Sequence, residues 1–239
     1  MGIFSFLQNL FGGGSSKVDV DVERAFMKID RLLNDEAAQN NTYIYLPDEV
    51  RENFFSLLHK GETPDEVPGA SGAFGRAYTN PIPVNGVLGE LNYLNLLRIA
   101  GTNEKVYFHR ICSLQNRIDV FELVNQSGTF YDALYFDMYY MGKSMKVPAG
   151  YAFAETVMEV RGITQTAANF PADLYQEIEQ EARLRYGLPI ADKDAMRIDV
   201  GRAQAIIPEE RKKFFARLTD HWNPREKLNI NMSRNLFQK

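Results

Sequence analysis

A change of hydrophobic period along the chain is the feature that most constrains its fold. Residues 105–112, 117–124 and 129–141 are rich in Val, Ile, Phe and Tyr, as is typical of β-strands. The sequence Asn-Gln-Ser-Gly at 125–128 favours a tight turn between the last two of them. Three consecutive strands with short connections predict an antiparallel meander, to which residues 151–160 could add a fourth strand.

Helical spacing of apolar residues is found on both sides of this meander. It covers 22–33, 47–61, 87–100 and 170–187, and Pro208 favours the start of a last helix. We therefore predict an α+β fold, with a central antiparallel sheet of three or four strands flanked by N- and C-terminal helices. Residues 17–239 are expected to form a single domain.

Residues 1–16 are set apart by their composition. An apolar stretch over 1–11 precedes a Gly/Ser hinge at 12–16. Such a stretch could contact a membrane or enter a groove of a partner. No lysine or arginine precedes Lys17, so a short helix on its own domain or a disordered end is favoured over membrane contact.

Composition excludes several classes of function. The 239 residues contain a single cysteine, Cys112, which forbids an intrachain disulfide and favours a reducing, cytoplasmic location. A net charge of −4 argues against a nucleic-acid surface. The three histidines, His59, His109 and His221, lie too far apart for a local zinc motif, so no metal site is predicted. No cofactor motif is present, and no cofactor is expected.

The long segment 62–86 is rich in Gly and Pro. Its centre, Gly69 to Arg76, matches neither the phosphate-binding glycine motifs nor the nucleophile elbow. Exposed amides beside Arg76 could hold an anion, but a structural or mobile loop is the favoured interpretation.

Polar residues on or beside the predicted strands are the candidates for a site. His109 and Asp137 could serve a hydrolase as base and orienting group. Binding candidates are Arg110 and Lys143, together with Arg76 of the loop. The odd offset between His109 and Cys112 places them on opposite faces of a regular strand, which excludes a local nucleophile–base pair.

The third predicted strand carries an aromatic face. Tyr135 and Tyr139 share it with Asp137, and such a face could bind a sugar or a basic peptide. A flank of the core is the favoured interpretation, because tyrosine is commonly half-buried in strands.

Five short segments resemble a family of uncharacterised bacterial proteins, over about residues 72–151. They are TNPIPVNG at 79–86, GELNYL at 89–94, FHR at 108–110, IDVFE at 118–122 and YDALYFDMYY at 131–140. The resemblance implies a bacterial cytoplasmic protein whose central block is one folded unit, and it transfers no catalytic residue and no ligand. Proteins of this kind often occur beside secreted toxins as immunity factors.

These observations together favour a non-enzymatic bacterial interaction protein, with an immunity protein that neutralises a toxin as its specific form. The partner is then another protein, whose identity and stoichiometry the sequence leaves open. The alternative is a hydrolase with a site between the Gly/Pro-rich loop and the sheet.

The charged residues are unevenly distributed along the chain. Residues 1–66 contain 12 acidic and 6 basic residues, and residues 207–239 contain 4 acidic and 8 basic residues. The two regions could pair in the fold, or the acidic one could bind a basic protein.

Overall fold

The computed structural model describes Met27, Arg31 and residues 48–115, 117–155, 159–186 and 190–211. Its elements are α4 (Asp48–Leu57), β1 (Ile82–Pro83), α5 (Gly86–Leu96), β2 (Leu97–Ile99), β3 (Val106–Leu114), β4 (Ile118–Asn125), β5 (Tyr131–Asp137), β6 (Tyr151–Phe153), β7 (Gly162–Ile163), α6 (Leu174–Tyr186), the 3-10 helix η2 (Lys193–Arg197) and α7 (Val200–Ile206). The segment 1–16, most of the predicted helix over 22–33, and all but the start of the helix after Pro208 lie outside these residues. None of the described helices is long and apolar enough to cross a bilayer.

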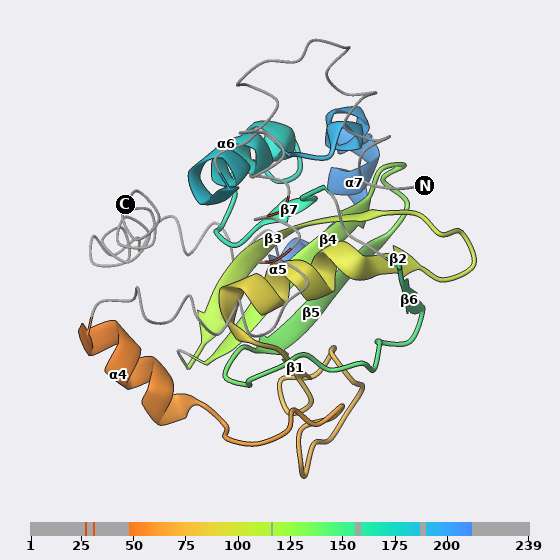
Figure 1. Ribbon diagram of the computed structural model, residues 1–239. Helices are drawn as coiled ribbons and strands as arrows, with labels where there is room; N and C mark the ends of the chain where they lie inside the picture. Colours follow the sequence, from red (N-terminus) through yellow and green to blue (C-terminus); the bar gives the residue numbers. More distant parts are fainter. Residues whose placement is uncertain are drawn as a thin grey trace.

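The α+β class and the central meander are confirmed. Strands β3, β4 and β5 pair antiparallel, in the predicted order. The sheet is nevertheless larger than predicted and mixed, with the strand order β1-β5-β4-β3-β7 (Figure 1). Both added strands are two residues long and pair in parallel. Two residues are too few to show a periodic pattern, so neither strand could be predicted from the sequence.

The predicted fourth strand is wrong in both extent and partner. Among the described residues of 151–160, the named strand covers 151–153, and it pairs with β2 in a separate two-stranded sheet. Strand β2 lies within the region predicted as helix over 87–100. Helix α5 stops at Leu96 because Leu97 adopts an extended conformation.

The turn between β4 and β5 forms as predicted. The side-chain Oδ1 of Asn125 accepts hydrogen bonds from the amides of Thr129 at 2.9 Å and Phe130 at 3.0 Å. Gly128 has φ +64°, and a Cβ there would overlap the backbone of α7 at Ala203. Glycine is therefore needed both for the turn and for the close approach of α7.

A β-bulge in β3 changes which residues share a face. Pairing with β4 shifts between Arg110 and Cys112, so that His109 faces Glu122 and Cys112 faces Val120. Glu122 and Val120 are two residues apart and lie on the same face of β4. The prediction that His109 and Cys112 point to opposite faces is therefore wrong, because the bulge adds a residue between them.

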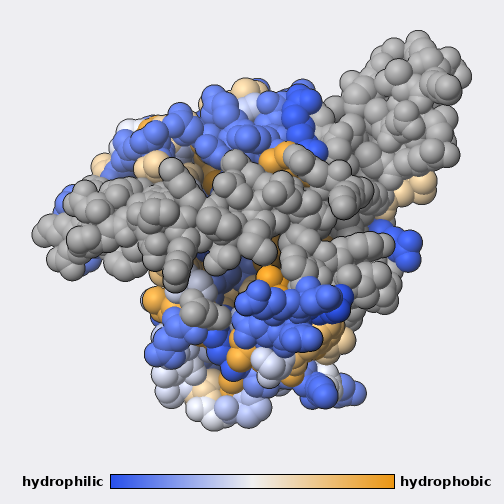
Figure 2. Space-filling model, turned by 90° about the vertical axis from the view of Figure 1, so that its left-hand side faces the viewer, coloured by the Kyte–Doolittle hydropathy of each residue, from blue (hydrophilic) through white to orange (hydrophobic). Residues whose placement is uncertain are grey.

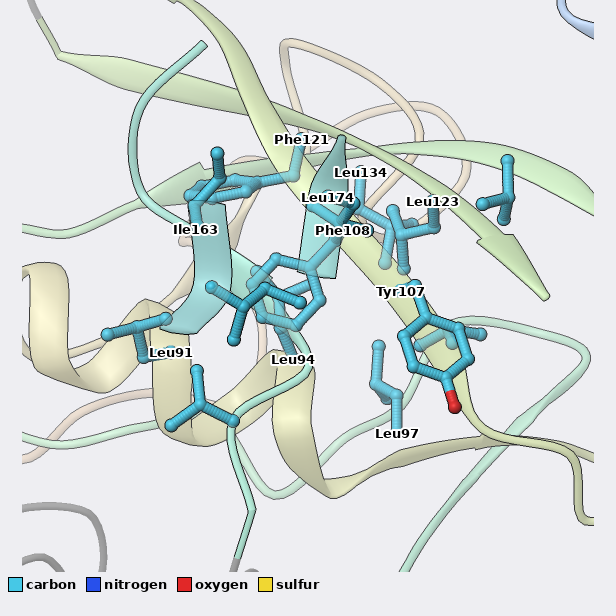
Figure 3. Close-up of a cluster of buried hydrophobic side chains, with 14 of the residues drawn as sticks. Leu91, Leu94, Leu97, Tyr107, Phe108, Phe121, Leu123, Leu134, Ile163 and Leu174 are labelled. Atoms are coloured by element: carbon cyan, nitrogen blue, oxygen red, sulfur yellow. The ribbon is translucent and has the colours of Figure 1, made fainter. Parts of the chain in front are cut away.

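The core lies between one face of the sheet and helix α5, which crosses that face in Figure 1. Phe108, Phe121 and Leu134 project from the three central strands and are fully buried. Figure 3 shows them beside Leu91 and Leu94 of α5. All but one of the eleven residues of α5 are buried, which fixes the helix firmly on the sheet.

Candidate functional site

The two predicted catalytic residues, His109 and Asp137, lie on the same face of the sheet but not together. His109 is registered with Glu122 of β4, whereas Asp137 is registered with Ile118. Four residues of an extended strand span about 13 Å. His109 and Asp137 are also on different strands, so they do not form a base and its orienting group.

His109 is fully buried, and the protein binds both of its ring nitrogens. Nδ1 accepts a hydrogen bond from the Ala167 amide at 3.0 Å, and Nε2 lies 2.7 Å from Oε1 of Glu122. The ring stacks on Phe170, with the centroids 4.0 Å apart and the planes 8° from parallel. Because an amide can only donate, Nδ1 carries no proton, and the neutral ring donates from Nε2 to Glu122. Burial lowers the pKa of His109 and keeps the ring neutral.

Glu122 is the centre of this cluster. Nε of Arg211 lies 2.8 Å from Oε2, Nη2 of Arg211 donates to Oε1 at 3.1 Å, and the hydroxyl of Tyr131 donates to Oε2 at 3.2 Å. Burial alone would raise the pKa of Glu122, but the His109 hydrogen bond and the Arg211 charge outweigh it and lower that pKa. The cluster is therefore an ion pair between Glu122 and Arg211, supported by a neutral histidine.

A small cavity of about 190 Å³ adjoins this cluster. Its described lining combines His109, Glu122 and Arg211 with the apolar residues Phe170 and Ile207. The polar atoms at its wall are already hydrogen-bonded to one another, so the cavity presents no described catalytic base.

Asp137, the last residue of β5, belongs to a second cluster, whereas the first cluster contains Tyr131 at the start of that strand. Its Oδ2 accepts hydrogen bonds from Nε of Arg117 at 3.0 Å and Nη2 of Arg117 at 2.9 Å, and its Oδ1 accepts one from the Tyr139 amide at 3.2 Å. Nη2 of Arg117 also contacts Nε2 of His59. The His59 ring stacks on Tyr140 with the centroids 4.5 Å apart, and its amide donates to the Tyr139 carbonyl at 2.8 Å. We call these five residues the α4 anchor, because they tie the segment after α4 to the sheet.

Arg76 pins the Gly/Pro-rich loop to the sheet. Its Nε donates to both carboxylate oxygens of Asp132, at 3.2 and 3.0 Å, and its Nη2 donates to the Ala149 carbonyl at 2.7 Å. The Tyr151 hydroxyl donates to the same carboxylate at 2.9 Å. Gly75, within the loop, accepts a hydrogen bond from the amide of Tyr135 at 2.8 Å. The interpretation of this segment as a structural loop is supported by these contacts.

The remaining binding candidates also contact the protein itself. Nη1 of Arg110 donates to Oδ2 of Asp119 at 3.0 Å. Nζ of Lys143 donates to Oδ1 of Asn92 on α5 at 2.7 Å. The side chain of Tyr139 packs against Phe54 of α4, with the ring centroids 5.2 Å apart. The structure therefore places the predicted site residues in separate clusters along the sheet.

These contacts share one pattern: each carboxylate of β4 and β5 has an arginine partner. The four pairs are Asp119–Arg110, Glu122–Arg211, Asp132–Arg76 and Asp137–Arg117. Sequence reasoning proposed two of these arginines but missed Arg117 and Arg211 as partners. The register of β4 and β5 could have suggested Arg117, which directly precedes Ile118, the β4 residue paired with Asp137 at the end of β5. Arg211 follows Glu122 by 89 residues, and no local pattern connects them.

Within the described ranges, no group of three or more His, Cys, Asp or Glu residues is placed to hold a metal ion. Comparisons with protein-family models, with curated proteins and with solved structures give no match for this chain.

Proposed function

We propose that this chain is a non-enzymatic bacterial protein that acts by binding another protein. The observation that carries the proposal is the arginine pairing of the four strand carboxylates. A general acid or base must reach substrate with a proton to give or take. Here the strand carboxylates that could do so are held in internal ion pairs, and His109 has both ring nitrogens bonded. The polar residues of the sheet thus serve the fold, which leaves the outer surface for function.

An immunity protein that neutralises a toxin in the cytoplasm is the specific form of this proposal. The sequence resemblance described above for residues 72–151 favours this form, although the comparisons with known proteins give no match. The excess of six acidic residues over 1–66 also favours it, since charge complementarity accelerates and orients protein association.

The test is whether the purified full chain has a protein partner in the cells that produce it. We expect one protein to co-purify in a fixed ratio and to rebind, once purified, with a Kd below about 1 μM, the range of specific complexes. An immunity function further predicts that co-expression with this chain restores the growth of cells in which the partner is toxic. Failure to find any protein that rebinds at micromolar concentration would refute the binding function.

The hydrolase alternative gains no support from the geometry. Arg76 closes the Gly/Pro-rich loop onto β5, and His109 and Asp137 lie in separate clusters. The decisive measurement is turnover of ester, amide and phosphoester substrates by the intact chain and by Asp137→Asn. A turnover that Asp137→Asn abolishes, while the variant remains folded, would restore the hydrolase.

A further inference from the structure

The described surface around α4 and α6 is mostly hydrophilic. Both helices lie on the left in Figure 1, and Figure 2 views the molecule from that side. On the described part of that face, hydrophobic residues show as separate small areas among hydrophilic ones. Scattered apolar residues are ordinary on a protein surface and do not mark a binding site. The more unusual group is an interior one, the imidazole of His109.

His109 holds the segment that follows β7. This segment, residues 164–171, leads from β7 towards α6. The Ala167 amide donates to Nδ1 of His109 at 3.0 Å, and the Phe170 ring stacks on the imidazole with the centroids 4.0 Å apart. Oγ1 of Thr166 adds a hydrogen bond to a backbone carbonyl of β3 at 3.2 Å. Two of these three contacts with β3 are thus made by His109, a residue type whose charge changes at mildly acidic pH.

Only the neutral form of His109 fits these contacts. In the neutral ring, Nδ1 accepts from the Ala167 amide while Nε2 donates to Glu122. The charged ring carries a proton on both nitrogens, so its Nδ1 could no longer accept a hydrogen bond. Two N–H donors would then face each other at a fully buried residue, and each would lack its acceptor. Protonation therefore acts directly on the bond that holds the segment.

Burial and two charged groups of the described chain act on this ring. Burial opposes the charged form most strongly, Glu122 of β4 favours it and Arg211 opposes it, and together they lower the pKa of His109. Tyr131, which donates to Glu122, and Cys112, on the same face of β3, stay uncharged because burial raises the pKa of both. The ring takes up a proton more readily once the segment has moved away and water reaches it. Acidification therefore favours the open form.

We propose that His109 is a pH-sensitive latch, and that protonation of its ring releases the segment 164–171 from β3. The small cavity beside the ring changes with the latch, because Ala167, Ala168 and Phe170 belong both to the segment and to the cavity lining. Mild acid thus loosens one wall of the cavity while the strands of the sheet stay paired. The latch is a property of the fold and does not depend on the proposed binding function.

Hydrogen exchange of the Ala167 amide measures the latch directly, because this amide exchanges only when its bond to Nδ1 is broken. A histidine side chain in water has a pKa of about 6.5, so an opening that frees the ring becomes up to about tenfold more frequent between about pH 7.5 and pH 5.5. NMR of the full chain, corrected for the intrinsic pH dependence of amide exchange, gives the opening constant at both pH values. We expect a rise of at least about threefold.

Three variants separate the titration from the packing. His109→Gln cannot take up the proton, so the opening constant at Ala167 should change by less than about twofold over the same pH range. His59→Gln removes an exposed histidine and should keep the full rise. Phe170→Leu removes the aromatic stack but keeps His109, so opening should be more frequent at both pH values and still rise in acid. Circular dichroism checks that each variant is folded. In the unmodified chain, the ¹⁵N chemical shifts of His109 should show Nδ1 without a proton at neutral pH, a measurement that needs no variant.

Three results would overturn the latch. A rise below about threefold at Ala167, or a rise above about twofold in His109→Gln, would show that another group controls the segment. An opening constant at Ala167 equal to the constant of global unfolding, measured by chemical denaturation, would show that the segment opens only when the whole chain unfolds. A proton on Nδ1 at neutral pH would exclude the bond from the Ala167 amide. None of these results bears on the proposed binding function.

Discussion

Replacing Glu122 with alanine tests the view that the sheet carboxylates serve stability. The carboxylate is almost fully buried and bonds to His109, Arg211 and Tyr131. Its loss would leave the Nε2 proton of His109 and the Tyr131 hydroxyl without their acceptor, at a cost of about 1–3 kcal/mol for each buried polar group. It would also remove the carboxylate that pairs with the guanidinium of Arg211, whose side chain is only 11% exposed.

Measured losses on breaking a buried ion pair are about 3–5 kcal/mol, and we expect Glu122→Ala to fall in that range. For a chain of 239 residues, such a loss lowers Tm by about 6–20 °C. Urea unfolding followed by tryptophan fluorescence and circular dichroism would measure it. The matched control is Glu52→Ala on the exposed face of α4, for which we expect a change within about 0.5 kcal/mol.

A double-mutant cycle with Arg211→Ala isolates the pair itself. The coupling energy between Glu122 and Arg211 should exceed about 1.5 kcal/mol, well above that of an exposed pair. A loss below about 1 kcal/mol for Glu122→Ala, or a coupling near zero, would show that water solvates the cluster. The argument that these carboxylates are structural would then fail at this position.

Three further predictions concern other parts of the fold. Asp132→Asn weakens the ion pair that holds the Gly/Pro-rich loop, so amide exchange and proteolysis over 62–76 should increase. Burial lowers the pKa of His109 in the folded state, so on acidification the unfolded chain binds a proton at this histidine at a higher pH than the folded chain does. The free energy of unfolding should therefore fall as the pH drops below about 6.5, the ordinary pKa of histidine. Gly162→Ala should cost at least about 3 kcal/mol, because its Cβ would overlap the Phe108 ring, whereas Gly201→Ala in helix α7 has space and should stabilise by about 0.5–1 kcal/mol.

Each of these has its own control. Exchange in α6, remote from the loop, should not change in Asp132→Asn. The pH dependence between about 5 and 7 should flatten in His109→Gln; an unchanged slope would assign it to another group. Equal stability of the two glycine variants would contradict the packing at β7, and chemical denaturation of both side by side measures the difference.

The meander could be predicted because its determinants are local. Strand propensity, the Asn125–Gly128 turn and short connections all act within a few residues of one another. The start of α4 after Pro47 could likewise be predicted from its first turn, because Asp48 and Glu49 favour a helix N-terminus. The alternation that places Asp132 and Asp137 on opposite faces of β5 also follows from local geometry.

Only the tertiary structure decided how distant segments meet. The bulge at Ile111 places Cys112 on the same face of the sheet as His109, and the position of such a bulge cannot be predicted from the residue types. The two-residue strands β1 and β7 exist only because the sheet edges offer them partners. The pairing of Glu122 with Arg211, across 89 residues, depends on the tertiary contact that brings Arg211 to β4. The sequence by itself determined local conformation and the kinds of side chain available. Folding decided that the carboxylates of β4 and β5 would each meet an arginine, because a charge leaves water only where the chain brings an opposite charge to it.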